Sequence, residues 1–207
     1  MAYMERTVER KFLHMSSFFK AVLVTGARQV GKTTMLKHLA EGQNRTYVTM
    51  DNTMARTLAQ SDPVLFFQTY KPPIIIDEIQ KAPELFEQIK IMCDESEERG
   101  LFWLTGSQQY RMMKNIRDTL AGRIGILELY SLSKEEVDGT VFSNKMDFSL
   151  PCLLERQKTA KKSDIVDVFE YIWRGGMPDA LRADSEQRQE YFLSLIHISL
   201  GRTMTRG

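Results

Sequence analysis

The stretch AVLVTGARQVGKTT, residues 21–34, decides the fold. Its first five residues are mostly apolar and β-branched, which is typical of a buried strand in a parallel sheet. Glycines at positions 26 and 31 then form a turn, and the residues from Lys32 to about Glu41 have the pattern of a helix. This order of strand, glycine-rich turn and helix places the turn at the carboxyl end of a strand, where open α/β sheets bind ligands.

The turn itself, residues 26–33, matches the pattern GxxxxGK[ST] in full. Its glycines let successive backbone N–H groups point at phosphate oxygens, and the N-terminal end of the following helix favours negative charge. We expect Lys32 to reach the β- and γ-phosphates of a nucleotide, and the Thr33 hydroxyl to ligate Mg²⁺. Arg28 contacts phosphate or anchors the loop. The predicted phosphate-binding residues are Gly26, Ala27, Arg28, Gln29, Val30, Gly31, Lys32, Thr33 and Thr34.

A second apolar run, residues 74–76, ends in the acids Asp77 and Glu78. Because the run has no polar residue, it indicates a strand that is covered on both faces. We expect Asp77 to hold Mg²⁺ together with Thr33, and Glu78 to act as a general base on the attacking water. Taken alone, the two acids would also suit the start of a helix, where negative charge is favoured.

Two further residues are candidate catalytic groups. Ser107 follows a strand expected at residues 101–105, where it could orient water beside the γ-phosphate, cap a helix, or do both. Arg123 lies where a neighbouring subunit could use it as an arginine finger, which stabilises charge in phosphoryl transfer. The alternative for Arg123 is a surface salt bridge.

The remaining pattern alternates short apolar runs with amphipathic stretches, which predicts an α/β fold with a mostly parallel sheet of five strands. Asp51-Asn52 suit a helix cap, and Asp62-Pro63 are expected to begin another helix. Residues 158–163 read as an exposed connector and residues 175–178 as a turn. Strands are expected at 21–25, 47–50, 74–76, 101–105 and 124–129, and helices at 32–41, 64–70, 83–99, 107–121 and 164–173.

Composition excludes several classes of protein. The 207 residues carry 28 Lys and Arg against 27 Asp and Glu, so the net charge of +1 gives no general argument for nucleic-acid binding. Two widely spaced cysteines and three histidines indicate neither a disulfide scaffold nor a zinc site. No apolar run is long enough to span a bilayer, and the N-terminal residues do not resemble a signal peptide. We therefore expect a cytoplasmic protein without a membrane partner.

A competing motif stands at residues 144–147, where NKMD resembles the guanine-reading motif of GTPases. The residues before it make a poor buried strand. The acidic strand end reads Asp77-Glu78-Ile79-Gln80, whereas a GTPase would have the pattern Asp-x-x-Gly. The pattern therefore disfavours the interpretation as a GTPase.

Taken in order, these motifs resemble the bacterial and archaeal family of AAA-type P-loop ATPases that carry a DUF4143 domain at the C-terminus. The resemblance implies a three-layer P-loop sandwich with ATP and Mg²⁺ as ligands. It also implies that Glu78 activates water and that Ser107 stands where related ATPases often have a sensor Asn. It rests on residues 26–34, 47–51, 76–85, 104–107, 120–124 and 175–178.

The resemblance predicts an ATPase core at residues 1–130 and a helical, lid-like region at 131–192. Family members continue after a Tyr-Phe pair, here Tyr191-Phe192, into a long C-terminal domain. The tail at 193–207 departs from that pattern. We expect it to be an artefact of a truncated gene or a disordered basic tail, so His197 is not a catalytic candidate.

The leading hypothesis is Mg²⁺-dependent ATP binding and hydrolysis, coupled to a conformational change in an attached or partner domain. The alternative is an ATP-controlled switch that binds DNA or protein with negligible turnover. A homo-oligomer is expected if Arg123 acts on a neighbour, and a DNA or protein partner would bind through the missing domain. A small-molecule kinase is less favoured, because no Arg-rich lid is evident.

Overall fold

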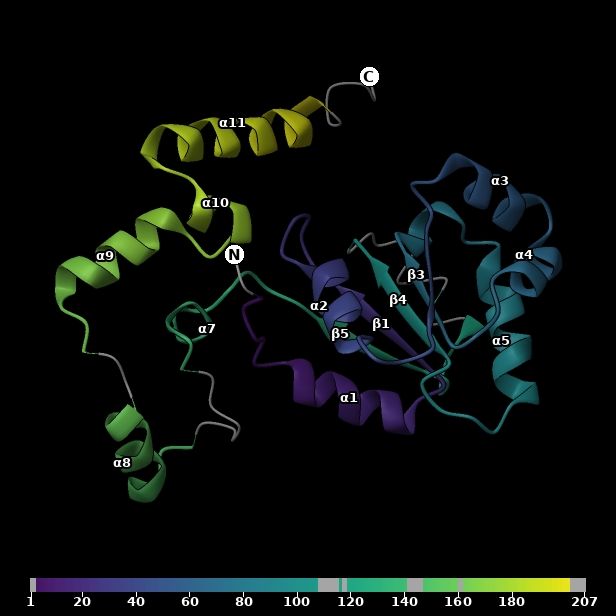
Figure 1. The fold of residues 1–207 in the computed structure, drawn as a ribbon, viewed down its shortest axis with the longest axis horizontal. Coiled ribbons are helices and arrows are strands. Elements are labelled where there is room, and N and C mark those ends of the chain that lie inside the picture. The colour runs from purple at the N-terminus through teal and green to yellow at the C-terminus, as the bar shows by residue number, and fades with distance from the viewer. Residues whose placement is uncertain (1–2, 108–115, 117–118, 141–146, 160–161, 202–207) are drawn as a thin grey trace. The chain divides into compact units, whose positions relative to one another are not determined.

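The computed structural model describes residues 3–107, 116, 119–140, 147–159 and 162–201. The chain divides into two compact units, Met1–Tyr130 and Ser131–Gly207 (Figure 1). The phosphate-loop motif and both acids of the sequence analysis lie in the first unit.

The first unit is built on a sheet of five strands. These are β1 (Ala21–Thr25), β2 (Thr46–Thr49), β3 (Ile74–Asp77), β4 (Phe102–Gly106) and β5 (Ile124–Glu128). Their order is β2-β3-β4-β1-β5, and every pair is parallel. The predicted α/β fold with a five-stranded parallel sheet is confirmed, and the strand ends agree with the sequence analysis to within about one residue.

The strand order separates the two sequence motifs. β1 pairs with β4 and β5, whereas β3 pairs with β2 and β4, so β4 lies between the strand before the phosphate loop and the strand before the acids. Because all strands are parallel, their carboxyl ends still meet at one edge. Side chains at the end of β4 can therefore contact both motifs.

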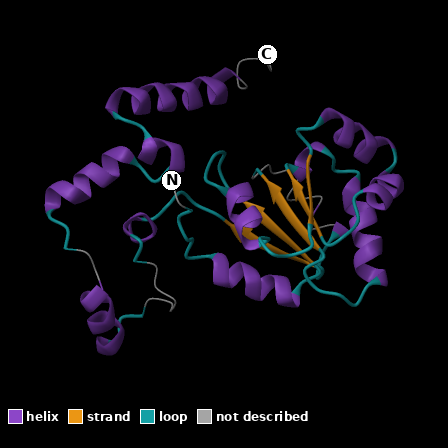
Figure 2. Cartoon of the chain, in the orientation of Figure 1, coloured by secondary structure: helices purple, strands orange, loops and turns teal. Residues whose placement is uncertain are grey.

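Helices cover both faces of the sheet (Figure 2). Successive side chains of a strand point to opposite faces, and the neighbours Phe102 and Trp103 of β4 show which helix lies on each. The Trp103 ring packs edge-on against Phe12 of α1 (Glu9–Phe18), with 4.8 Å between the ring centres. The Phe102 ring contacts Phe67 of α4 (Pro63–Thr69) at 5.7 Å. Helix α1 was not predicted from the sequence.

The other helices of this unit begin as the sequence indicates. Asn52 accepts the N–H groups of Met54 and Ala55 at the start of α3, and Asp62 accepts the N–H of Leu65 at the start of α4, so both predicted caps are confirmed. The remaining elements are α2 (Lys32–Leu39), α3 (Thr53–Ser61), the 3-10 turn η1 (Ile79–Lys81) and α5 (Leu85–Glu95).

The helix expected to reach Arg99 ends at Glu95, because Ser96 has an extended backbone. The polar helix expected at 107–121 falls mostly outside the described residues.

The second unit is helical. Asp164 caps α9 reciprocally with Asp167, and α9 begins and ends within one residue of the prediction. Helix α11 continues past residue 192, where the sequence analysis placed the start of an atypical tail. The NKMD motif at 144–147 lies mostly outside the described residues. The helices are α7 (Lys134–Asp138), α8 (Leu150–Thr159), α9 (Ile165–Arg174), α10 (Pro178–Arg182) and α11 (Ser185–Gly201).

Among the described residues, no helix combines the length and the apolar character that crossing a membrane requires.

Candidate nucleotide site

The loop between β1 and α2 is tightly curled. Gly26, Gln29 and Gly31 have positive φ angles of 147°, 61° and 94°, a region that glycine adopts more readily than other residues. A Cβ at Gly26 would lie 2.2 Å from the carbonyl oxygen of Leu129, so only glycine fits there. The loop is thereby packed against the segment that follows β5.

Lys32 closes the loop from inside. Its Nζ donates to the carbonyl oxygens of Ala27 at 2.7 Å and Gly26 at 3.1 Å, and the residue is 6% exposed. Burial lowers the pKa of this ammonium group, and the carboxylates of Glu78 and Asp77 oppose the shift. The structure thus places one positive charge between the loop carbonyls and the acidic pair.

The rest of the predicted phosphate loop lies around this ammonium group. Arg28, Ala27 and Gln29 are exposed, whereas Val30 is buried. Thr34 is exposed on the first turn of α2. Ala27, Arg28 and Gln29 are therefore accessible to a ligand from solvent.

Asp77 is the point at which the two motifs meet. Its Oδ1 accepts from the Thr33 hydroxyl at 2.5 Å, and the residue is 8% exposed. These are the two side chains predicted to share a metal ion, and the structure brings their oxygen atoms into direct contact.

Thr105 on β4 was not singled out from the sequence. It is completely buried, donates to Asp77 Oδ1 at 2.5 Å, and accepts the backbone N–H of Glu78 at 3.0 Å. One hydroxyl therefore orients both acids. The signal available in the sequence was its place at the end of a buried strand, in Leu104-Thr105-Gly106-Ser107.

Tyr47 on the edge strand β2 is a second contact that the sequence analysis missed. Its hydroxyl lies 3.3 Å from Asp77 Oδ2, and the Nζ of Lys37 lies 3.8 Å from the centre of its ring. Burial, together with the negative charge of Asp77, raises the pKa of Tyr47 to about 12. The neutral hydroxyl remains a donor to Asp77 throughout the physiological range.

Glu78 has an unusual backbone conformation, and its carboxylate is hydrogen-bonded to Gln80. Its φ of 57° lies in the left-handed region, which is uncommon for a residue with a side chain. The Nε2 of Gln80 donates to the Glu78 carboxylate. The Gln80 Oε1 is buried and has no hydrogen-bond partner among the described residues. Left-handed backbone angles at residues with a side chain, such as that of Glu78, cluster at functional sites.

The other two candidate catalytic residues lie at opposite ends of the strands. Ser107 directly follows β4 at the edge that carries the loop and the acids. Arg123 directly precedes β5 and therefore lies at the amino ends of the parallel strands. Its guanidinium donates to both carboxylate oxygens of Asp94, at 2.5 and 3.0 Å, and this hydrogen bonding lowers the pKa of Asp94.

The oxygen groups fit a magnesium ion. Mg²⁺ prefers oxygen ligands and is usually held by one or two protein groups together with phosphates and water. Thr33 and Asp77 supply such a pair at the mouth of the loop. Among the described residues, no cluster of three or more His, Cys, Asp or Glu residues occurs.

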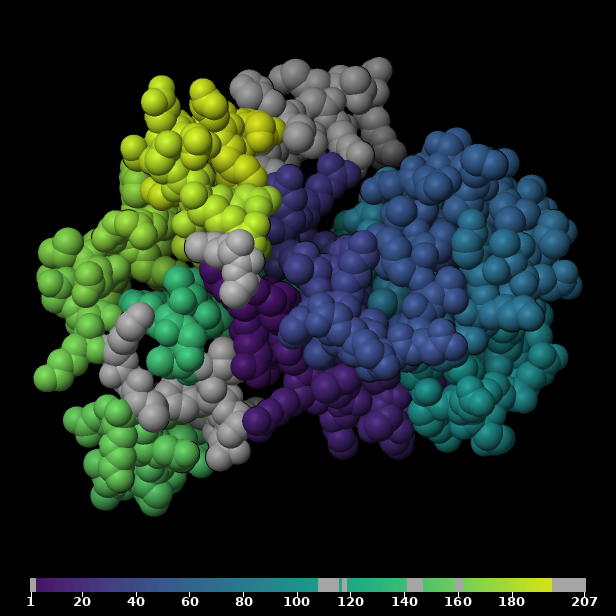
Figure 3. Space-filling model, viewed as in Figure 1, coloured from purple at the N-terminus to yellow at the C-terminus, as the bar shows by residue number. Residues whose placement is uncertain are grey.

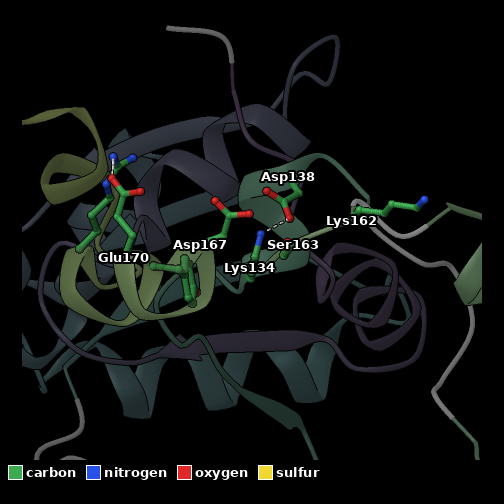
Figure 4. Close-up of a pocket in the computed structure, with 8 residues that line it drawn as sticks. Lys134, Asp138, Lys162, Ser163, Asp167 and Glu170 are labelled. Atoms are coloured by element: carbon green, nitrogen blue, oxygen red, sulfur yellow. Dashed lines mark hydrogen bonds and ion pairs between the residues drawn. The ribbon is translucent and has the colours of Figure 1, made fainter. Parts of the chain in front are cut away.

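The second unit contains a polar pocket of about 240 Å³ (Figure 4). Two of its cations are paired, since Lys134 binds Asp138 at 2.6 Å and Arg174 binds Glu170. The Tyr171 hydroxyl donates to the Leu132 carbonyl at 2.7 Å. These contacts within the unit involve much of the polar lining of the pocket.

Solved structures support the fold. The Walker-type ATPase PABY2304 of Pyrococcus abyssi is 16% identical, with a TM-score of 0.61 over 99% of this chain and 77% of that one. AMPPCP-bound DnaA from Aquifex aeolicus is 10% identical, with a TM-score of 0.50 over 84% of this chain and 57% of that one. At these identities the likeness shows the fold alone.

Sequence relatives place the chain more closely. The uncharacterized proteins Rv2008c of Mycobacterium tuberculosis and Mb2031c of Mycobacterium bovis are each 30% identical over 128 residues. The match covers 62% of this chain but only 28% of the length of those relatives. The family model described as an AAA domain matches residues 18–138, which is more than half of the chain. The chain therefore belongs to the AAA domain family.

Proposed function

We propose that the chain binds ATP at this edge of the sheet and hydrolyses the β–γ anhydride with the help of Mg²⁺. The observation that carries the proposal is the 2.5 Å contact between Thr33 Oγ1 and Asp77 Oδ1. It joins the glycine-rich loop to the acidic strand end, although β4 separates the two strands. In P-loop proteins a hydroxyl and a carboxylate of this kind hold Mg²⁺ beside the phosphates.

Lys32 and the loop amides bind the phosphates in this proposal. A buried ammonium group is costly unless it is paired with an anion, and Lys32 contacts loop carbonyl oxygens. Exchange of those carbonyls for phosphate oxygens would pair the charge. Bound Mg²⁺ supplies neutralisation of the negative charge on the β- and γ-phosphate oxygens.

Glu78 accepts a proton from the water that attacks the γ-phosphate. A general base must be oriented toward that water, and two contacts support this role. Thr105 holds the backbone of Glu78, and Gln80 holds its carboxylate. Ser107 lies at the same edge and is proposed to help orient the water.

Arg123 is proposed to act on the site of a neighbouring copy. Arg123 lies beside the amino end of β1, whereas the loop follows its carboxyl end. The five residues of β1 separate the two by about 16 Å, so Arg123 is too far from the loop of its own chain to contact a bound γ-phosphate. To act in trans, its guanidinium would have to leave Asp94. Coupling of hydrolysis to the unit from Ser131 onward, or to a DNA or protein partner, is proposed from the family resemblance.

Phosphate release from ATP tests the proposal. We expect Lys32→Ala to lose ATP binding, and Glu78→Gln to retain ATP binding but lose turnover. Glu84→Gln, the same substitution at an exposed glutamate that directly precedes α5, is the matched control and should behave as the wild type. Unchanged binding in Lys32→Ala would refute the phosphate loop, and unchanged turnover in Glu78→Gln would refute the base. ATP binding without turnover in the wild type would favour the switch.

Mixing two variants tests the role of Arg123. Glu78→Gln and Arg123→Ala should each be inactive alone. In a mixed oligomer, a Glu78→Gln copy can lend its arginine to the intact site of an Arg123→Ala copy, so mixing should restore part of the turnover. A chain that stays monomeric with ATP in sedimentation, yet hydrolyses ATP, would exclude the trans role.

A further inference from the structure

Arg6 is a buried arginine that contacts the phosphate loop from outside the motif. It precedes α1 and is 5% exposed. Its Nη1 donates to the Val30 carbonyl oxygen at 2.8 Å, and its Nη2 donates to the Tyr130 carbonyl oxygen at 2.6 Å. One guanidinium thus joins three segments: the N-terminal residues, the loop after β1 and the residues after β5.

The N-terminal segment is itself fixed in place. The Glu9 carboxylate accepts the backbone N–H of Arg6 at 2.6 Å and the Tyr3 hydroxyl at 2.6 Å. The Tyr3 ring lies 3.9 Å from the ring of His38 on α2. The space-filling view shows the purple N-terminal atoms against the indigo atoms of α2 (Figure 3). Arg6 is therefore presented to the loop by a segment with limited freedom.

The contact with Val30 controls the direction of a loop amide. The six atoms of a trans peptide group are coplanar, so the C=O of Val30 and the N–H of Gly31 point in opposite directions. When Arg6 holds the carbonyl, it also aims the Gly31 N–H to the other side of that plane. Gln29 and Gly31 both have positive φ, so this peptide lies in the part of the loop where the backbone adopts left-handed angles.

We propose that Arg6 is a positioning residue that fixes the Val30–Gly31 peptide plane for phosphate binding. The inference rests on the proposed function. The two ends of the loop are held differently: Gly26 packs against the Leu129 carbonyl, whereas Val30 is tied through Arg6 to Tyr130. The role requires a planar fork with several donors, because two separate carbonyl groups must be reached at once.

Arg6→Lys is the test variant, and Arg45→Lys is its matched control. Arg45 also donates to two backbone carbonyls, those of Gly100 at 2.9 Å and Leu101 at 3.3 Å, and its guanidinium lies 3.9 Å from the Trp103 ring. These contacts lie at the amino ends of β2 and β4, at the edge of the sheet away from the loop. Both variants keep the charge and lose the fork.

The first readout is backbone hydrogen exchange in the protein without nucleotide. Arg6→Lys should raise exchange in a peptide covering residues 26–34, and Arg45→Lys should leave that peptide as in the wild type. This readout does not depend on ATP binding. Equal exchange in the wild type and Arg6→Lys would overturn the positioning role, and so would an equal rise in both variants.

The second readout is the dissociation constant for ATP. Arg6→Lys should weaken binding about tenfold or more, which corresponds to the loss of one hydrogen bond from a charged donor. Arg45→Lys should change it by less than about twofold. If the wild type does not bind ATP, the proposed function fails, while the exchange measurement still decides the role of Arg6. If the wild type binds ATP and Arg6→Lys binds equally well, the inference fails alone.

Discussion

The buried hydroxyl of Thr105 provides a demanding test of the site, because Thr105→Val removes its hydrogen bonds with little change in shape. The variant loses the bond to the Asp77 carboxylate at 2.5 Å and leaves the N–H of Glu78 without its acceptor. A bond to a charged group contributes about 1.5–3 kcal/mol and a neutral one about 0.5–1.5 kcal/mol. We therefore expect the free energy of unfolding to fall by about 2–4 kcal/mol.

Thr105→Ser separates the hydroxyl from the methyl group. It keeps both hydrogen bonds and loses only one buried methyl, which should cost about 1 kcal/mol. Urea unfolding of the nucleotide-free protein measures both variants. Typical domains have about 5–15 kcal/mol of stability, so either variant should remain folded enough for assay.

The same pair of variants should separate in activity. Without the Thr105 bond, Asp77 loses one of the donors that orient it, so Thr105→Val should need more Mg²⁺ for half-maximal phosphate release. Thr105→Ser should keep the wild-type Mg²⁺ dependence. If Thr105→Val is no less stable than Thr105→Ser and has the same Mg²⁺ dependence, the hydrogen bonds of the Thr105 hydroxyl to Asp77 and Glu78 contribute neither to stability nor to Mg²⁺ binding.

Two other perturbations have defined outcomes. Gly26→Ala should lose ATP binding and destabilise the fold by more than Gly42→Ala, since its Cβ would meet the Leu129 carbonyl at 2.2 Å whereas Gly42, also at positive φ, has nothing within 4 Å; equal unfolding midpoints in urea would refute the close approach. Tyr47 should titrate at about pH 12 in the folded protein, against about 10 when unfolded. A raised pKa gives a stability contribution that is complete below about pH 10 and is lost as the pH rises toward 12. Tyr47→Phe should flatten that part of the stability curve, and an unchanged curve would exclude Tyr47 as its source.

The sheet and the loop could be read from the sequence for a clear physical reason. β1 and β3 are buried at every residue, so their apolar runs are uninterrupted and indicate strands covered on both faces. The loop pattern is equally direct, since its glycines adopt backbone angles that other residues avoid.

The contacts around Asp77 could not be read in the same way. Tyr47 and Thr105 reach it because β2 and β4 flank β3. Strand order is a tertiary property, and nothing in the local pattern of β2 or β4 specifies it. Both side chains stand in stretches that the sequence analysis had marked as strands, but without a partner assigned to them.

Helix α1 was missed for a different reason. Only three of its ten residues are buried, Glu9, Phe12 and Ser16, so its apolar period is weak. Its place is set by distant contacts, since Phe12 packs on Trp103 and the Ser16 hydroxyl accepts the Trp103 indole N–H at 2.8 Å. Tertiary packing, rather than helix propensity, decides this element.

The position of Arg6 bears on how this domain is cut or transplanted. The match to the AAA domain begins at residue 18, whereas the side chain that ties Val30 to Tyr130 stands twelve residues earlier. A fragment trimmed to the matched region would keep every residue of the GxxxxGK[ST] motif but lose the hydrogen bonds of Arg6 to Val30 and Tyr130. It would also uncover Trp103, against which Phe12 packs. For expression, chimeras or assays of an isolated core, residues 3–17 are best kept, because Arg6 contacts the loop after β1 and Phe12 packs on the sheet.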